Sequence, residues 1–176
     1  MQRALLIIDM LNDFVRPGAP LEVPQNREIL PALQQRLLNA RRDGTPVIFV
    51  SDGHSPEDPE FSRMGWPPHA IEGTEGAAII TELAPQPGES LIKKTTYSGF
   101  NGTALEATLK KFDIEELVLT GCVTNICILY TAADAVMKGY RVIVPTDSIA
   151  HLDPAEGEFA LNQMKNILGV QVERPR

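Results

Sequence analysis

The alternation of short apolar runs with helical patterns is the feature that most constrains how this chain folds. Six runs rich in valine, isoleucine and leucine have the composition of strands buried on both faces, at residues 4–8, 47–50, 91–92, 117–119, 142–144 and 170–172. Helical patterns separate most of them, at residues 29–42, 103–111, 125–138 and 154–168. Strands that alternate with helices join by right-handed crossovers, so we predict a three-layer α/β/α fold with a mostly parallel, Rossmann-like central sheet.

The helix starts and one long irregular segment add detail to this prediction. Residues 51–88 show little periodicity beyond a short helical pattern at residues 77–83, and a loop of that length in a compact domain is usually functional. Two helix starts have capping signals, which are Thr103 with Glu106 as a capping box and Asp153 as an N-cap before Pro154.

Length and charge limit the function classes. A chain of 176 residues builds one hydrophobic core, so we expect one domain over residues 1–176. The net charge of −7, without a long run of either sign, argues against nucleic acid or an anionic membrane surface as the main partner. No stretch approaches the roughly 18 to 20 apolar residues of a membrane span, and no cationic and apolar leader begins the chain. We therefore expect a cytoplasmic protein whose two cysteines, Cys122 and Cys127, are free thiols.

Chemically active residues follow four of the predicted strands. The ligand of an open α/β sheet sits beyond the carboxyl ends of the strands, and those positions hold Asp9, residues 51–54, Lys93, Lys94, and the Gly121 that leads to Cys127. We expect these residues to meet in one crevice. A lysine there could offset the charge of a carboxylate and a thiolate, but the residues alone do not choose between the two lysines. No glycine-rich turn follows the first strand and the sequence has no phosphate loop, so a nucleotide cofactor is not expected.

Cys127 is the candidate nucleophile. It falls in the first turn of a helical pattern that starts near Thr124, where free amides and the helix dipole lower the pKa of a thiol. The alternative is a small buried hydrophobic residue, and this is the role that we expect for Cys122, which lacks the helix terminus. Asp9 could act as the base that takes the thiol proton or as a turn former, and Asp13 is expected to be a structural hydrogen-bonding partner.

Three residues have the composition of a metal site. Asp52 and His54 are alternate residues at a strand end, so both side chains lie on the same side, and His69 follows in the same loop. Mixed nitrogen and oxygen ligands suit Zn, Fe or Mn, with open positions for water or substrate. The alternative is that these are loop residues bonded to the backbone. His151 is expected to be a bystander.

These residues lie in ordered motifs that span nearly the whole chain. The motifs are IIDMLNDF at residues 7–14, SDGH at 51–54, WPPHAIEGTEG at 66–76, KTTYSGF at 94–100 and GCVTNICILYTAADAVMKGYRV at 121–142. The last is the most specific, because a G-x-x-T-x-x-C start followed by TAxDAxxxGY is hard to obtain by chance. In this order the motifs resemble the isochorismatase-like cysteine hydrolase superfamily, and the DxH and WPxH elements resemble its nicotinamidase/pyrazinamidase-like branch.

The resemblance implies roles for the residues at the strand ends. It implies a triad of Asp9, Lys94 and Cys127, and it selects Lys94 because the lysine of the family directly precedes the segment leading to YSGF. It also implies a cis peptide at Cys122–Val123 and an oxyanion hole made by the backbone N–H groups of Val123 and Cys127.

The branch implies a metal site and a ring-binding site. Its metal ligands correspond to Asp52, His54 and His69, with zinc as the expected metal, and its aromatic walls correspond to Phe14 and Trp66. The chain departs from the pattern of the branch at several positions: Gly53 stands for a tryptophan, Asp58 for a histidine, Glu60 for a serine, Ala70 for a cysteine and Asn125 for an acidic residue. The insert between the lysine and YSGF is also missing. Glu60 is either an added ligand, directly or through water, or a solvated loop carboxylate.

The resemblance implies a metal-assisted amide hydrolase, and nicotinamidase is the particular activity expected. The alternatives are another amidase of the superfamily, acting on a carbamoyl, ureido or maleamate-type amide, and an inert member that only binds a small ligand. The partner expected is a small-molecule amide, with a homo-oligomer, either dimer or tetramer, implied by the relatives.

Overall fold

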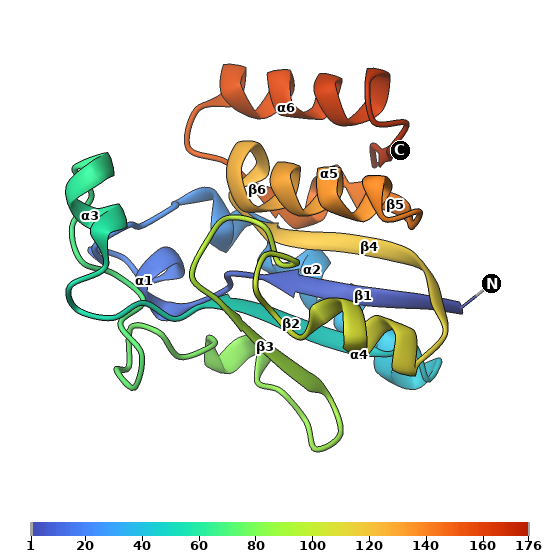
Figure 1. Cartoon of the computed structure of the whole chain (residues 1–176), viewed down its shortest axis with the longest axis horizontal. Helices are drawn as coiled ribbons and strands as arrows, with labels where there is room; N and C mark the ends of the chain where they lie inside the picture. Colours follow the sequence, from blue (N-terminus) through green and yellow to red (C-terminus); the bar gives the residue numbers. More distant parts are fainter. Residues whose placement is uncertain (1, 176) are drawn as a thin grey trace.

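One parallel sheet forms the centre of the molecule, as the computed structural model of residues 2–175 shows (Figure 1). The order of its strands is β3-β2-β1-β4-β5-β7, with the short β6 paired to β4, and every pairing is parallel. The strands are β1 (Gln2–Ile8), β2 (Val47–Asp52), β3 (Ser90–Lys94), β4 (Ile114–Cys122), β5 (Arg141–Pro145), β6 (Ile149–Ala150) and β7 (Gln171–Glu173). Each apolar run singled out in the sequence overlaps a strand, and only β6 was not expected.

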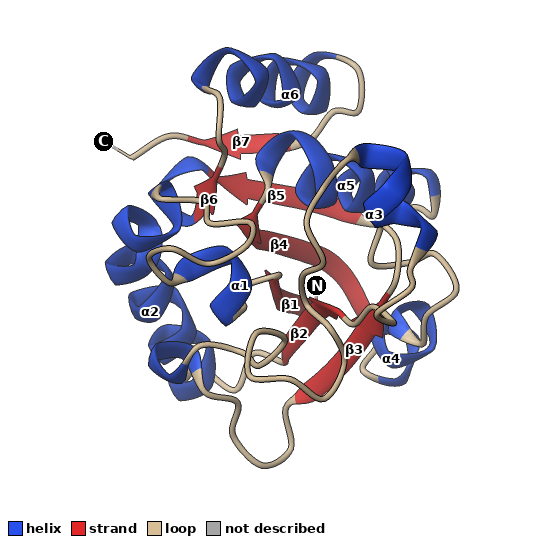
Figure 2. Ribbon diagram, turned by 90° about the vertical axis from the view of Figure 1, so that its left-hand side faces the viewer, coloured by secondary structure: helices blue, strands red, loops and turns tan. Residues whose placement is uncertain are grey.

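Helices cover both faces of the sheet and complete the predicted three layers (Figure 2). They are α1 (Asn12–Val15), α2 (Gln25–Arg42), α3 (Pro59–Met64), α4 (Leu105–Lys111), α5 (Leu129–Met137) and α6 (Pro154–Asn166), with short turns η1 (Thr81–Leu83), η2 (Thr124–Ile128) and η3 (Thr146–Ser148). One apolar core joins α1 and α2 to the sheet, and the other joins α4, α5 and α6 to the opposite face. Among residues 2–175, no helix combines the length and the apolar character that crossing a membrane requires.

The N-cap predicted from the sequence is confirmed at one helix, and the capping box predicted at another is wrong. Asp153 caps α6 by accepting hydrogen bonds from two amides of the first turn, as predicted. The capping box expected at Thr103 and Glu106 is wrong. The Thr103 hydroxyl accepts from the Leu105 N–H, while the Glu106 carboxylate pairs with lysines of α4 and of the segment after α5. A tertiary ion pair therefore replaces the local cap.

The long irregular segment contains a helix that the sequence analysis missed. The pattern at residues 77–83 gives only the single turn η1, whereas α3 begins at Pro59 with Asp58 as its N-cap. The signal was present in the sequence, because Asp58 and Pro59 repeat the arrangement of Asp153 and Pro154 that predicts α6.

The carboxyl ends of β1 and β4 lie side by side, where the strand order reverses. Such a reversal leaves a crevice for a ligand. Gly121 allows the close approach of the two strands: its φ is +103°, and a Cβ there would lie 2.0 Å from the Ile8 carbonyl oxygen. Asp9 follows β1 with a left-handed φ of 53°, a conformation that costs energy for a residue other than glycine.

Candidate active and metal site

Lys94 lies between two carboxylates and the candidate nucleophile. Its Nζ is 2.8 Å from Asp9 Oδ2, pairs with Asp52 Oδ1 and is 3.4 Å from Cys127 Sγ. The lysine side chain is buried, and atoms of Asp9, Asp52 and Cys127 lie within 4.8 Å of one another. The four strands β1 to β4 and the turn after β4 thus bring together the triad that the resemblance implied.

The charges of this cluster control its proton positions. Burial and the neighbouring Asp52 raise the pKa of Asp9 to about 6, although Lys94 opposes the shift. Burial also raises the pKa of the Cys127 thiol well above its usual value, and Lys94 only partly offsets this. The lowered thiol pKa expected from the helix start is therefore wrong in direction. A raised pKa favours the protonated thiol, so a thiolate requires transfer of the proton to a neighbouring base.

The nucleophile candidate lies on a widened helical turn. η2 is a π-helical turn, in which the Ile128 amide donates to the Val123 carbonyl 3.2 Å away, and α5 continues from it. The peptide between Cys122 and Val123 is cis, as the resemblance implied. Val123 and Cys127 both border the cavity at the carboxyl end of β4. These are the two residues whose amides were expected to form an oxyanion hole.

The second cysteine is held in the core. The Cys122 thiol has no exposed surface, donates to the Asp9 carbonyl at 3.3 Å and accepts from the Asn26 side chain. Burial, with Asp9 adding to it, raises the pKa of Cys122 above its usual range. These contacts agree with the packing role expected for it.

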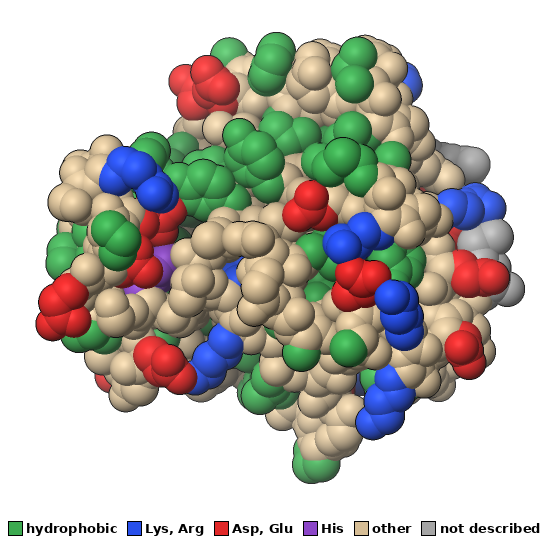
Figure 3. All heavy atoms as spheres, viewed as in Figure 1, with side chains coloured by type: hydrophobic (Ala, Val, Ile, Leu, Met, Phe, Trp, Pro, Cys, Tyr) green, Lys and Arg blue, Asp and Glu red, His purple; other side chains and the backbone are tan. Residues whose placement is uncertain are grey.

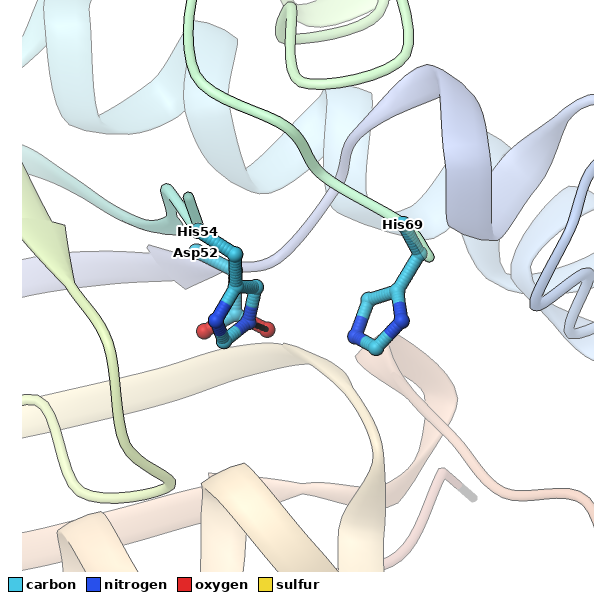
Figure 4. Close-up of side chains that lie close together, drawn as sticks. All are labelled: Asp52, His54 and His69. Carbon is cyan, nitrogen blue, oxygen red and sulfur yellow. Dashed lines mark ion pairs between the residues drawn. The ribbon is translucent and has the colours of Figure 1, made fainter. Parts of the chain in front are cut away.

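The three predicted metal ligands converge beside this cluster. Asp52 and His54 come from the end of β2 and the residues after it, and His69 comes from the loop that returns over them (Figure 4). One ligand atom from each lies within 4.8 Å of the other two, and the two imidazole centroids are 5.1 Å apart. Both histidines are buried.

The hydrogen bonds of the histidines fit a metal ion. The Nδ1 atoms of both rings face acceptors, His54 at 3.0 Å from Asp58 Oδ2 and His69 at 2.9 Å from the Pro67 carbonyl. A proton on each Nδ1 leaves each Nε2 with a lone pair, which is the tautomer a metal requires. His54 Nε2 is buried and has no hydrogen-bond partner among residues 2–175. A cation would satisfy this atom.

Glu60 adds negative charge to the same place. It is buried, and its Oε2 lies 3.5 Å from His54 Nε2, while Asp52 Oδ2 lies 3.7 Å from the same atom. Burial lowers the pKa of His54, but the hydrogen bonds of Asp52 and Asp58 outweigh it and raise the pKa to about 9. The surroundings therefore favour a positive charge here, and Glu60 is not the solvated loop carboxylate that was the alternative.

Aromatic and apolar side chains form the rest of the cavity. Phe14 and Trp66 border it as predicted, with ring centroids 5.6 and 6.1 Å from that of His69. A hollow beside α3 exposes histidine and acidic surface (Figure 3). Tyr97 and Leu152 also border the cavity, although neither was predicted from the sequence. The position of Tyr97 in the KTTYSGF motif was the available signal for it, whereas nothing local marked Leu152.

The remaining sequence candidates lie outside the chemical cluster. Lys93 is exposed and pairs with Glu72 on the surface. Asp13 accepts a hydrogen bond from the Ala70 amide and so ties the loop to α1, the structural role expected for it. His151 packs against the first turns of α6 near Gly157 and does not border the cavity.

Fold and site together define a class: a three-layer α/β protein that gathers a cysteine, a lysine and carboxylates beyond the carboxyl ends of its parallel strands. A family model for the isochorismatase domain matches residues 3–174. The chain therefore belongs to the isochorismatase family and is a hydrolase of that family.

The similarity to relatives and to solved structures extends over most of this chain. The chain is 36% identical to the isochorismatase family protein PncA of Bacillus subtilis, over 98% of this chain and 99% of that protein. It is 36% identical to a maleamate amidohydrolase of Pseudomonas putida, over 89% and 76% of the two chains. The crystal structure of a Bacillus subtilis nicotinamidase/pyrazinamidase superposes with a TM-score of 0.91 at 35% identity, over 98% of this chain and all of the other. The crystal structure of a Pyrococcus horikoshii pyrazinamidase in complex with zinc superposes with a TM-score of 0.92 at 28% identity, over 99% of this chain and all of the other.

Proposed function

We propose that this protein is a nicotinamidase, which hydrolyses nicotinamide to nicotinate and ammonia through a thioester on Cys127. The observation that carries the proposal is the lining of the cavity, which combines the aromatic side chains of Phe14 and Trp66 with the nucleophile Cys127 and, beside it, the metal ligands Asp52 and His69. A flat aromatic ring with an amide on one side and a ring nitrogen on the other matches this arrangement. The nicotinamidase and pyrazinamidase names of the structural neighbours support it.

The charge of the cavity favours a neutral amide over an anionic one. Among the described residues that border the cavity, none is a lysine or an arginine, whereas Asp9, Asp52 and Glu60 are acidic. Lys94 already forms ion pairs with two of these carboxylates, Asp9 and Asp52. Maleamate carries a carboxylate beside its amide, and with no lysine or arginine among these lining residues only the proposed metal ion could offset that buried anion. A neutral amide needs no such compensation and therefore fits the lining better.

In the first half of the proposed reaction, Asp9 takes the Sγ proton of Cys127 and the thiolate adds to the amide carbonyl. The oxyanion accepts hydrogen bonds from the Val123 and Cys127 amides, and each such donor typically contributes about two to three powers of ten in rate. Asp9 then gives its proton to the amide nitrogen, the C–N bond breaks and ammonia leaves. A thioester between the acyl group and Cys127 remains.

In the second half, Asp9 is again a carboxylate and acts as the base for water. It takes a proton as the water oxygen adds to the thioester carbonyl, and the same amides hold the oxyanion. The C–S bond breaks, the acid leaves, and the proton on Asp9 returns to the thiolate. Lys94 keeps its charge throughout and makes the alternation of charge between Asp9 and Cys127 tolerable.

The metal-binding residues in this proposal are Asp52, His54, His69 and Glu60. A divalent ion, zinc being the one we propose over iron or manganese, would act as a Lewis acid toward the ring nitrogen and so orient the ring. Phe14 and Trp66 hold the ring from its two faces, and the substrate enters as a free small molecule. A dimer or tetramer is proposed from the relatives alone.

Ammonia release from a panel of amides tests the proposal. The panel contains nicotinamide, pyrazinamide, maleamate and N-carbamoylsarcosine, given to zinc-loaded protein, to protein treated with a chelator and to Cys127→Ala. We expect turnover of the two ring amides only, lost in the variant and strongly reduced by the chelator. Turnover of maleamate or N-carbamoylsarcosine in preference to nicotinamide would replace this function with another amidase activity, and an intact rate in Cys127→Ala would remove the proposed nucleophile.

A further inference from the structure

Asp58 contacts two different parts of the metal site with its two carboxylate oxygens. Oδ2 lies 3.0 Å from Nδ1 of His54, and Oδ1 accepts a hydrogen bond of 2.9 Å from the backbone N–H of Glu60. His54 and Glu60 lie on either side of it in the sequence, two residues after the end of β2 and in the first turn of α3. One carboxylate therefore joins two candidate metal ligands that come from separate elements.

The contact with His54 decides which nitrogen of the ring is available to a metal. A carboxylate accepts but cannot donate, so it requires the proton on Nδ1 and leaves the lone pair on Nε2. Nε2 is the buried atom without a partner, and it faces Asp52 Oδ2 at 3.7 Å and Glu60 Oε2 at 3.5 Å. The side chain of Asp58 thus sets the tautomer that a ligand at this position needs.

The contact with Glu60 decides where that side chain lies. α3 has only six residues, and a helix so short does not persist by itself in water. Asp58 caps it, Pro59 fixes its first residue and the left-handed Gly65 ends it, so the cap determines where Glu60 begins its first turn. Glu60 is buried because of this placement.

We propose that Asp58 is a positioning residue for the metal, which it does not itself need to touch: it holds the tautomer of His54 and the position of Glu60 at once. The inference rests on the metal site of the proposed function and not on the identity of the amide. It also gives a role to a position at which the loop departs from the pattern of the resembled branch.

The chain contains a matched control for this residue. Asp153 caps α6 in the same way, with Pro154 next to it and Oδ1 accepting from the amides of Ala155 and Glu156, and no histidine contact is found for it among residues 2–175. Asparagine caps helices about as well as aspartate, but it offers one acceptor oxygen where Asp58 serves two donors. Asp58→Asn therefore removes at least one of the two contacts, while Asp153→Asn keeps its cap.

Zinc affinity, measured in competition with a chromogenic chelator, is the first readout. We expect Asp58→Asn to bind zinc about 10- to 100-fold more weakly than wild type, the usual effect of losing an outer partner of a metal-bound histidine. Asp153→Asn should lie within about twofold of wild type. The second readout is the ¹⁵N spectrum of the imidazoles in protein without added metal, recorded at a pH above the His54 pKa of about 9 so that the ring is neutral. His54 should lose its preference for the Nδ1–H tautomer in Asp58→Asn only.

Each outcome decides a different point. Equal zinc affinity in wild type and Asp58→Asn would overturn this inference and leave the metal site intact. An unchanged His54 tautomer would show that Asp58 does not control the protonation of that ring. An equal loss of zinc affinity in Asp153→Asn would show that general destabilisation is responsible. A wild-type protein that binds no zinc at 1:1 stoichiometry would instead overturn the metal part of the proposed function. Failure to hydrolyse nicotinamide would leave the inference standing.

Discussion

The two halves of the crevice are held in place in different ways. In the half that contains the nucleophile, Asp9, Lys94 and Cys127 are fixed at or just after the carboxyl ends of parallel strands, where the backbone ladder sets their spacing. In the half that contains the metal ligands, Asp52 is also fixed at the end of β2, but His69 and Glu60 lie in the long loop and are held by hydrogen bonds outside the sheet. Of the substitutions relative to the resembled branch, those at Gly53, Asp58, Glu60 and Ala70 fall in the second half, and the one at Asn125 falls in the turn that holds Cys127.

This difference suggests that the two halves respond differently to substitution. Moving a residue at the end of a buried parallel strand disturbs the register of its neighbours, so the reacting half has little freedom to vary. A loop residue can change if another side chain takes over its hydrogen bond or charge. We therefore expect the chemistry to depend on the sheet and the metal affinity to depend on the loop.

The largest effect is expected from Lys94→Ala, with Lys93→Ala as its neighbour control. Removing the buried cation leaves Asp9 and Asp52 facing each other, so kcat/KM should fall by about three powers of ten or more, with about 3 kcal/mol of stability lost as well. Lys93 forms an exposed pair, and its loss should change stability by less than about 1 kcal/mol. Unfolding followed by circular dichroism measures the stability, and kinetics normalised to the folded fraction measure kcat/KM. Similar losses in the two variants would contradict the distinction between the buried and the exposed lysine.

A second test probes the sheet beneath the reacting half through two glycines with similar φ. A Cβ at Gly121 would lie 2.0 Å from the Ile8 carbonyl oxygen, whereas one at Gly139 has no heavy atom within 4 Å, and the φ values are +103° and +90°. Both alanine variants carry the backbone strain, but only Gly121→Ala forces β1 and β4 apart. We expect it to lose about 2 kcal/mol more than Gly139→Ala in urea unfolding. Equal losses of unfolding free energy in the two variants would show that β1 and β4 can move apart without an energetic cost.

The smallest effect is expected in the loop half, from Glu60→Gln. The buried carboxylate becomes neutral with almost the same shape, so zinc should bind about tenfold more weakly while the thermal midpoint of the protein without added metal stays close to that of wild type. Glu57→Gln, an exposed change in the same loop, is the control and should leave zinc affinity unaltered. Zinc affinity in Glu60→Gln that equals wild type would return Glu60 to the role of a loop carboxylate.

Local patterns predicted most of the fold and part of the site. The apolar runs identified the strands, and the rule that ligands sit beyond strand ends identified Asp9, Asp52 and the turn before Cys127. The sequence could not separate Lys94 from Lys93 by pattern, because both lie at the end of the same strand, β3, and their side chains differ only in the face of the sheet to which they point. The resemblance selected Lys94, and the structure buries that lysine while leaving its neighbour exposed.

The errors have the same physical origin. The thiol pKa was expected to fall because a helix start is a local feature, yet burial and two carboxylates from other strands raise it. The capping box at Thr103 failed because Glu106 is drawn to a lysine beyond α5. Groups distant in sequence act in both cases, although at Glu106 the neighbouring Lys110 of the same helix contributes as well.

By itself, the sequence determined the alternation of strands and helices, the parallel sheet and the set of residues at its carboxyl edge, because periodicity and burial are recorded in the order of the side chains. Only the tertiary structure decided that Lys94 lies between Asp9 and Asp52, that His54 Nε2 is left without a partner and that Asp58 serves two ligands. Hydrogen bonds and charge depend on distances of a few ångströms between residues far apart in the chain, and only the packing of strands, helices and loop sets those distances.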